Sequence, residues 1–148
     1  MRGLSLSHSR GVTLIELMVV VVVIAVLASI AVPSYRSYVL RAQRADGKAE
    51  LLRVRTAQEK FFLQNNQYAD EDQLDVAPPA GLGLSTTSEH GHYTIALDRP
   101  TSTTFTATAT ATAGQTEDFL CQTFTVNELG QRTAEDSGGN DSTPRCWR

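Results

Sequence analysis

The chain has 148 residues, with 13 Lys and Arg against 16 Asp and Glu, a net charge of −3 and 41% hydrophobic residues. This length fits one domain with an attached segment. The composition excludes a polytopic membrane protein, a fully disordered chain and a strongly basic domain that wraps nucleic acid. The two cysteines are too few for a disulfide-dense miniprotein or a four-cysteine zinc site.

The apolar residues are concentrated near the N-terminus, between Val12 and Val32. From Leu17 to Val32 the run has no charge, and its only polar residue is Ser29. As a helix, residues 12–32 would span about 30 Å, the thickness of the hydrocarbon core of a bilayer. A chain this short cannot surround such a helix on every side. We therefore predict a membrane-spanning helix over 12–32 rather than a buried core helix.

Two features distinguish this run from a plain anchor. Glu16 lies near its start, where a carboxylate in hydrocarbon costs roughly 2.5–3.5 kcal/mol and requires a partner. The preceding segment is short and positive, with Arg2 and Arg10 and no acid, which favours a cytoplasmic location for it. A secretory signal cleaved after Ala28 is the alternative, but that reading gives no role to Gly11 or to Glu16.

The residues GVTLIEL, from Gly11 to Leu17, resemble the processing motif of type IV prepilins. The resemblance implies that a prepilin peptidase cuts between Gly11 and Val12, removes residues 1–11 as a leader and methylates the new amino group of Val12. It also implies that Glu16 neutralises the terminal amine of a neighbouring subunit during assembly. Two opposite charges buried in a low-dielectric bundle stabilise each other, whereas each alone is costly.

A second helical pattern follows the apolar run. Pro33 comes directly after it, and residues 34–64 are rich in helix formers without another proline. We predict one helix from Val12 to Gln64, kinked at Pro33 and weakened at Gly47. Pilins resemble this plan, with a first half that protrudes and a second half that packs on a sheet. The apolar residues that recur at helical spacing are Val39, Ala42, Ala45, Ala49 and Leu52, then Leu51, Val54, Phe61 and Phe62.

Five cations lie on the second half of this helix: Arg41, Arg44, Lys48, Arg53 and Arg55. We expect them to form a basic outer face that is solvated or lies between subunits. Contact with DNA is the alternative, and it is disfavoured because no aromatic residues are interleaved with the charges.

Residues 65–91 differ in composition, with the acidic run Asp70–Asp72 and the pair Pro78–Pro79. This composition predicts an irregular connection rather than a buried element. The carboxylates lack the correctly placed glycine and distal glutamate of an EF-hand loop. His90 and His92 cannot complete a zinc tetrad alone. We expect no metal site and no cofactor.

The C-terminal half alternates between apolar and polar residues. Strands are predicted over His92–Asp98, Thr103–Ala113 and Thr123–Val126, with a turn at Arg99–Ser102 and a short fourth strand over Gln131–Ala134. In the second strand the alanines would let a helix approach closely while the threonines face water. Three or four antiparallel strands on one helix make an α+β domain, which the family resemblance identifies as a pilin fold.

The tail from Glu135 to Arg148 is rich in Gly, Ser and Asp, and a crosslink is what would hold it down. Cys121 and Cys146 supply one, because the membrane helix places the domain outside the cytoplasm, where disulfides persist. Closing this loop would stabilise the domain by roughly 3–3.5 kcal/mol. Reactive cysteines are the alternative, but no CxxC motif or helix N-terminus is near. Pilins similarly close a C-terminal loop, which in that family often carries subunit contacts.

Three C-terminal segments, Pro100–Phe105, Leu129–Arg132 and Cys146–Arg148, look like those of minor pilins of gammaproteobacterial type IV pili. This resemblance implies a single-pass inner-membrane protein with a periplasmic domain over 33–148 that enters an extracellular pilus, helps prime assembly and supports adhesion and twitching motility. The implied partners are the prepilin peptidase, the major pilin, other minor pilins, the inner-membrane assembly platform and membrane lipid. No nucleic acid is required.

Several alternatives remain open at this stage. A type II secretion pseudopilin shares the N-terminal motif, although the pair Cys121 and Cys146 favours a pilus subunit, and a major pilin is a further possibility. From another class, the chain could be an anchored or secreted enzyme or binding protein. We expect no catalytic residues, because the sequence has no Ser-His-Asp arrangement, phosphate-cradling glycine loop or paired-carboxylate motif.

Overall fold

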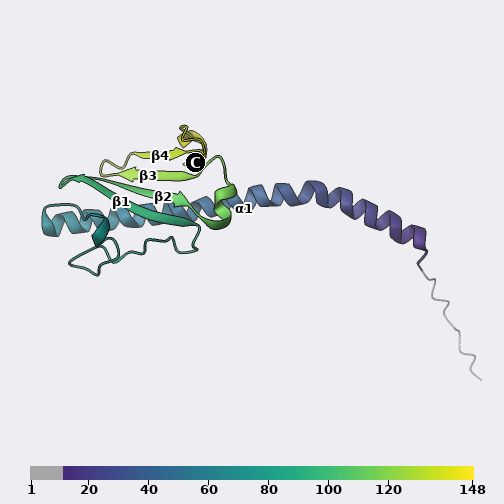
Figure 1. Cartoon of the computed structure of the whole chain (residues 1–148), viewed down its shortest axis with the longest axis horizontal. Coiled ribbons are helices and arrows are strands. Elements are labelled where there is room, and N and C mark those ends of the chain that lie inside the picture. Colours follow the sequence, from purple (N-terminus) through teal and green to yellow (C-terminus); the bar gives the residue numbers. More distant parts are fainter. Residues whose placement is uncertain (1–11) are drawn as a thin grey trace, which may run out of the picture. The chain divides into compact units, whose positions relative to one another are not determined.

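The computed structural model describes residues 12–148 (Figure 1). They divide into two compact units, one up to Arg36 and one from Ser37 to Arg148. The helix α1 (Leu14–Asn65) belongs to both and contains Pro33. The helix predicted from Val12 to Gln64 is therefore confirmed, with each end within two residues of the prediction.

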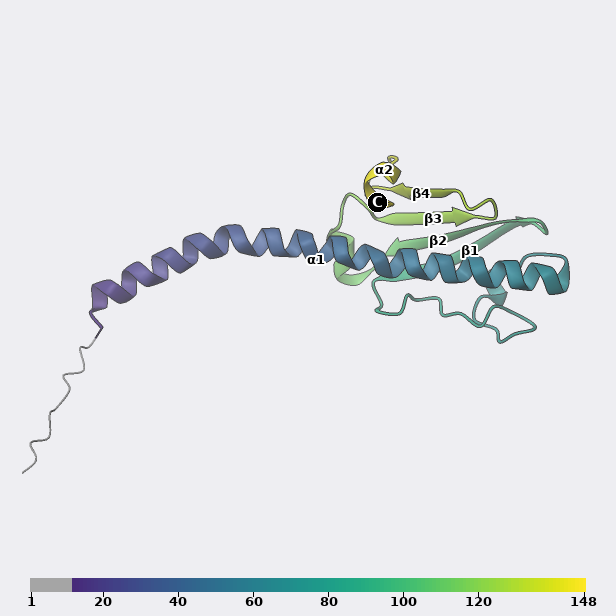
Figure 2. The same ribbon diagram turned by 180° about the vertical axis from the view of Figure 1, so that it is seen from behind.

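The second unit combines the later part of α1 with one antiparallel sheet, which confirms the predicted α+β fold. The strands are β1 (Tyr93–Thr101), β2 (Thr104–Ala111), β3 (Thr123–Asn127) and β4 (Arg132–Glu135). Each pairs with the next in the chain, so the sheet order is β1-β2-β3-β4 (Figure 2).

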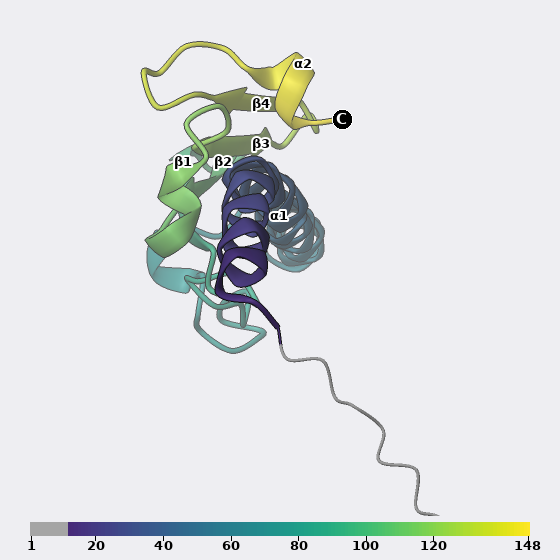
Figure 3. The same cartoon turned by 90° about the vertical axis from the view of Figure 1, so that its right-hand side faces the viewer.

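Three short helices complete the unit: η1 (Glu71–Gln73), η2 (Ala113–Glu117) and α2 (Thr143–Cys146). Viewed along α1, α2 lies beside β4 (Figure 3), where the Ala134 N–H donates to the Thr143 hydroxyl at 2.8 Å. The tail therefore holds a turn of helix that the composition did not predict.

The core lies between α1 and one face of the sheet. On β2, Phe105, Ala107 and Ala109 are fully buried, whereas the intervening threonines are at least partly exposed. This confirms the predicted division of β2 into a buried alanine face and a more exposed threonine face. α1 comes close to β1 at Gly47, where a Cβ atom would lie 2.8 Å from the ring of Tyr93.

The strand boundaries differ from the prediction in two places. β1 continues through the predicted turn to Thr101, which pairs with Thr104 after an irregularity that begins at Asp98. β2 ends at Ala111 rather than Ala113, because Ala113 has a left-handed φ of 49° and begins η2. The turn could not be predicted, because Ala113 continues the regular alternation of apolar and polar residues in β2.

The predicted apolar stripe of α1 is wrong in part. Ala42, Ala45, Ala49 and Leu52 are exposed, so the side of the helix that carries them is not covered by the sheet. Three of the buried residues of α1 are polar or charged: Arg44, Glu50 and Gln58. The others are Gly47, Leu51, Val54 and Phe61.

The connection over residues 65–91 is also more buried than predicted. Tyr68, Ala69, Leu74 and Leu82 belong to the core. The Gln58 side chain fixes the connection by donating to the Ala69 carbonyl at 2.9 Å and accepting from the Ala69 N–H at 2.8 Å. This paired hydrogen bond satisfies both ends of a buried amide, and it could not be predicted from composition.

Candidate functional site

The first candidate is the apolar segment at the start of α1. Every residue from 12 to 32 is exposed, and the large apolar side chains there are between 50% (Val20) and 77% (Leu14) exposed. Among the described residues, α1 is the one helix that is long and apolar enough to cross a bilayer. A fully exposed apolar helix needs lipid or another protein to cover it.

The start of α1 has a hydrogen bond that organises this segment. The Glu16 N–H donates to the Thr13 side-chain oxygen at 3.2 Å, so Thr13 caps the helix. Thr13 and Glu16 have the spacing of a capping box, Thr-x-x-Glu, a signal that our reading of the sequence missed. The carboxylate of Glu16 in the first turn also complements the positive end of the helix dipole.

The processing residues stand as follows. Val12 precedes the helix and is 71% exposed, whereas Gly11 lies outside the described residues. Cleavage between them, methylation of Val12 and the assembly role of Glu16 therefore stay predictions. Pro33 lies inside α1, and the kink assigned to it also stays a prediction.

A buried ion pair joins α1 to the segment after η2. Arg44 donates to the two carboxylate oxygens of Asp118, at 2.6 Å from Nε and 2.9 Å from Nη2. The Gln115 amide donates to Asp118, to the Tyr93 hydroxyl and to the Leu40 carbonyl. Burial and the charge of Asp118 raise the pKa of Tyr93 far above its usual value, so this hydroxyl serves as a neutral hydrogen-bonding group.

The basic outer face predicted for α1 is only partly present. Arg44 is buried with Asp118, and Arg53 pairs with Glu50 at 3.2 Å and Glu89 at 2.8 Å. Lys48 donates to carbonyl oxygens of the C-terminal segment. Three of the five cations therefore have ion pairs or hydrogen bonds within the domain.

The C-terminal segment is fixed by the predicted disulfide. Cys121 and Cys146 are bonded, with their Cα atoms 5.8 Å apart, and both are buried. Trp147 follows directly, and its indole N–H donates to the Thr133 carbonyl at 2.7 Å while its ring meets Phe124 edge-on. The tail is therefore held by a crosslink and by an aromatic anchor.

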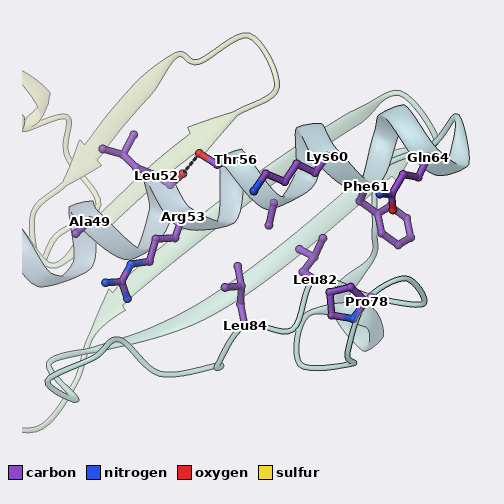
Figure 4. Close-up of a pocket in the computed structure, with 12 residues that line it drawn as sticks. Ala49, Leu52, Arg53, Thr56, Lys60, Phe61, Gln64, Pro78, Leu82 and Leu84 are labelled. Atoms are coloured by element: carbon purple, nitrogen blue, oxygen red, sulfur yellow. Dashed lines mark hydrogen bonds between the residues drawn. The ribbon is translucent and has the colours of Figure 1, made fainter.

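A groove of 580 Å³ runs between α1 and the connection near Pro78–Leu84. In Figure 4, Leu52 of α1 and Leu82 and Leu84 of the connection line it, with Arg53 and Lys60 along its side. An open groove with an apolar lining and basic residues can accept an apolar surface that carries an acid. It presents no group arranged for catalysis among its lining residues.

The two loop histidines have a structural partner. His90 lies 3.1 Å from a carboxylate oxygen of Asp46 and stacks on His92 with 6.2 Å between the ring centroids. Within residues 12–148, no three His, Cys, Asp or Glu side chains are grouped so that they could hold a metal ion.

Two family models match the chain. The model described as "Type IV minor pilin ComP, DNA uptake sequence receptor" matches residues 33–125, more than half of the chain. The model described as "Prokaryotic N-terminal methylation motif" matches residues 6–32, the segment that contains Glu16. The chain belongs to the type IV pilin family.

Relatives of this pilin are named as pilus subunits. The "Type IV major pilin protein PilA" of Myxococcus xanthus is 39% identical over 74 residues, which cover 49% of this chain and 34% of that protein. A "Fimbrial protein" of Dichelobacter nodosus is 39% identical over 92 residues, which cover 61% of this chain and 52% of that protein. The pilin thus spans about a third to a half of the length of these two relatives.

A "Type IV major fimbrial protein FimA" of Dichelobacter nodosus is 36% identical over 64% of this pilin and 58% of that protein. Among solved structures, "High-Resolution Structure of a Type IV Pilin from Shewanella oneidensis" aligns with a TM-score of 0.46 and 19% identity, over 63% of this chain and 89% of that chain.

Proposed function

We propose that this pilin is a minor subunit of a type IV pilus, which helps prime assembly and then joins the filament, supporting adhesion and twitching motility. The match of residues 33–125 to a minor-pilin model carries this proposal. The C-terminal segments that resemble the minor pilin PilE add to it. In this role the protein is structural, and it needs no cofactor.

The proposed pathway begins in the inner membrane, with the C-terminal domain in the periplasm. The prepilin peptidase removes residues 1–11 and methylates Val12, and residues 12–32 stay in the bilayer until the assembly platform extracts the subunit. The fully exposed apolar helix supports this step, because lipid and the centre of a filament are both apolar covers for it. Glu16 then pairs with the amine of a neighbouring major or minor pilin.

A major pilin is the alternative within the family, since the relatives named above include major pilins. A minor pilin and a major pilin differ in their abundance in the filament. Quantitative mass spectrometry of sheared pili should find this subunit at a small fraction of the most abundant pilin, and deletion of its gene should reduce piliation. If it is instead the most abundant protein of the filament, the minor role is wrong. A pseudopilin of type II secretion would be absent from sheared pili.

DNA binding is a second candidate, favoured by the printed description of the matched family model. The charges of this chain favour it less, because the net charge is −3 and Arg44 and Arg53 are paired with carboxylates. Nucleic-acid affinity depends strongly on unpaired cations and on salt. A fluorescence-anisotropy titration of the full chain in detergent, with duplex DNA at two salt concentrations, tests it. Salt-dependent binding would add DNA to its partners.

A further inference from the structure

Two hydrogen bonds place the start of α1 directly after Thr13. The Glu16 N–H donates to the Thr13 side-chain oxygen and the Leu17 N–H donates to the Thr13 carbonyl, each at 3.2 Å. A residue that accepts the first helical hydrogen bond at its carbonyl, and a second at its side chain from the N–H three residues later, is an N-cap. Val12 and Thr13 themselves lie outside the helix, which begins at Leu14.

This boundary lies next to the proposed cleavage site. Hydrolysis there breaks the C–N bond between Gly11 and Val12, so that the hydroxyl of water goes to the Gly11 carbonyl carbon and its proton to the Val12 nitrogen. Val12 is not helical and is 71% exposed. Exposed irregular segments are the preferred sites of proteolysis, whereas in a helix each carbonyl is engaged by an N–H four residues later. Cleavage therefore requires α1 to begin after Val12.

Without the Thr13 hydroxyl, the helix would grow toward the cleavage site. The Glu16 N–H would lose its acceptor, and an unpaired N–H at the edge of the hydrocarbon is costly. The nearest backbone substitute is the carbonyl of Val12, four residues earlier. Valine is a poor N-cap residue, whereas glycine is an acceptable one, so growth that continues past Val12 to Gly11 is favoured. The peptide bond to be cut would then lie within the first turn.

We propose that Thr13 is a positioning residue for prepilin processing, because its hydroxyl ends α1 and keeps the bond between Gly11 and Val12 available to the peptidase. The inference rests on the proposed function, since it requires cleavage at that bond. The hydroxyl acts on the chain's own backbone rather than on the enzyme. The match of residues 6–32 to the methylation-motif model supports processing in this part of the chain.

The alternative is that the peptidase contacts the Thr13 hydroxyl directly, and substitutions separate the two roles. Serine and asparagine are both good N-cap residues, but asparagine has neither the hydroxyl nor the shape of threonine. Valine has nearly the shape of threonine and cannot cap a helix. The order of the cleavage rates across these side chains therefore distinguishes a helix cap from a contact with the enzyme.

The test measures kcat/KM for the release of residues 1–11 from the full precursor by a prepilin peptidase in detergent. Thr13→Ser and Thr13→Asn should be cleaved within about twofold of the parent chain, since both keep a cap. Thr13→Val and Thr13→Ala should be cleaved about fivefold more slowly, the effect of losing one N-cap on a local helix equilibrium. Ser29→Ala is the matched control. It removes a hydroxyl that donates to the Val26 carbonyl inside α1, and it should leave the rate unchanged.

Two patterns of rates would overturn the proposal. Equal rates for all four Thr13 variants would mean that the cap does not control cleavage. A rate for Thr13→Asn as low as that for Thr13→Val would mean that the enzyme contacts the hydroxyl itself. If the parent chain is not cleaved at all, the proposed function fails together with the inference, whereas equal cleavage of every variant overturns the inference alone.

A second measurement detects the start of the helix without the enzyme. In the intact precursor in detergent micelles, the Cα chemical shift of Val12 should have a non-helical value for the parent chain and for Thr13→Asn. It should move toward a helical value in Thr13→Val. An unchanged Val12 shift together with slow cleavage of Thr13→Val would also overturn the proposal, because the slow rate would not come from growth of the helix.

Discussion

Arg44 and Asp118 lie 74 residues apart in the sequence and form a two-contact ion pair with side chains only 10% and 5% exposed. Burial of the two charges is tolerated because each satisfies the other, and the Gln115 amide adds a further donor to Asp118. The pair fixes the link between η2 and β3 against α1.

Replacing Asp118 with Asn should destabilise the domain by about 3–5 kcal/mol, because it leaves the Arg44 guanidinium buried without its counter-charge. The free energy of unfolding can be measured by urea titration of the full chain in detergent, followed by Trp147 fluorescence. Glu89→Gln is the matched control, because the Arg53–Glu89 pair is 55% and 60% exposed, and it should cost less than about 1 kcal/mol. Equal midpoints for the two variants would contradict this account.

Gly47 should not tolerate even alanine. A glycine-to-alanine change inside a helix normally stabilises by about 1 kcal/mol. Here the added methyl group would lie 2.8 Å from the Tyr93 ring, so Gly47→Ala should instead cost about 1–3 kcal/mol through overpacking. The exposed Ala45→Gly provides the comparison and should cost only the propensity difference of about 1 kcal/mol. A higher melting midpoint for Gly47→Ala would refute the close approach of α1 and β1.

The Asp46 carboxyl should make the free energy of unfolding depend on pH in the acid range. Burial opposes its ionisation, but hydrogen bonds from the Ser88 hydroxyl at 2.6 Å and from His90 hold the pKa of this carboxyl below its usual value. A pKa lowered by folding contributes stability above the unfolded pKa of about 3.9, and that stability is lost as the pH falls through the folded pKa.

Asp46→Asn should therefore be less stable than the parent chain by about 1–2 kcal/mol at pH 6, and the difference should shrink below about pH 3. Urea titrations across this range measure it. Asp72→Asn removes an exposed carboxylate and serves as the control for the change in net charge. If the two free energies of unfolding differ by the same amount at pH 6 and below about pH 3, folding does not favour the ionised form of Asp46.

Two proposed roles of the Glu16 side chain, in the helix cap and in assembly, can be separated by substitution. Glu16→Gln keeps the residue type of a capping box while removing the charge, and Glu16→Ala removes both. Both variants should insert into the membrane as well as the parent chain, since neither buries a charge. Both should fall at least about tenfold in sheared pili if charge neutralisation drives assembly, because an unpaired buried charge costs several kcal/mol. Normal recovery of Glu16→Gln would assign Glu16 to the helix cap alone.

Much of this fold could be predicted from local patterns. The uninterrupted apolar run and the helix formers after Pro33 predicted α1, and the alternation around Phe105 predicted β2 with its buried alanine face. The disulfide could be predicted because the apolar run led us to expect the domain outside the cytoplasm, where two cysteines have few other roles.

What could not be predicted depends on contacts between distant residues. Alanines at helical spacing suggested a buried stripe, yet the sheet packs on the other face of α1, where Gly47 admits the Tyr93 ring. Arg44 had the appearance of a solvated cation because its partner lies on another element. The cap between Thr13 and Glu16 was a local signal that could have been read from the sequence.

The central claim is that the apolar segment is the retained helix of a processed pilin. The most direct measurement is the intact mass and N-terminal peptide of the protein recovered from sheared pili. The account predicts a chain that begins at Val12 and carries an added methyl group on its amine. A mature protein that begins at Ser29 would show that the apolar segment is a cleaved secretory signal, and it would contradict the account.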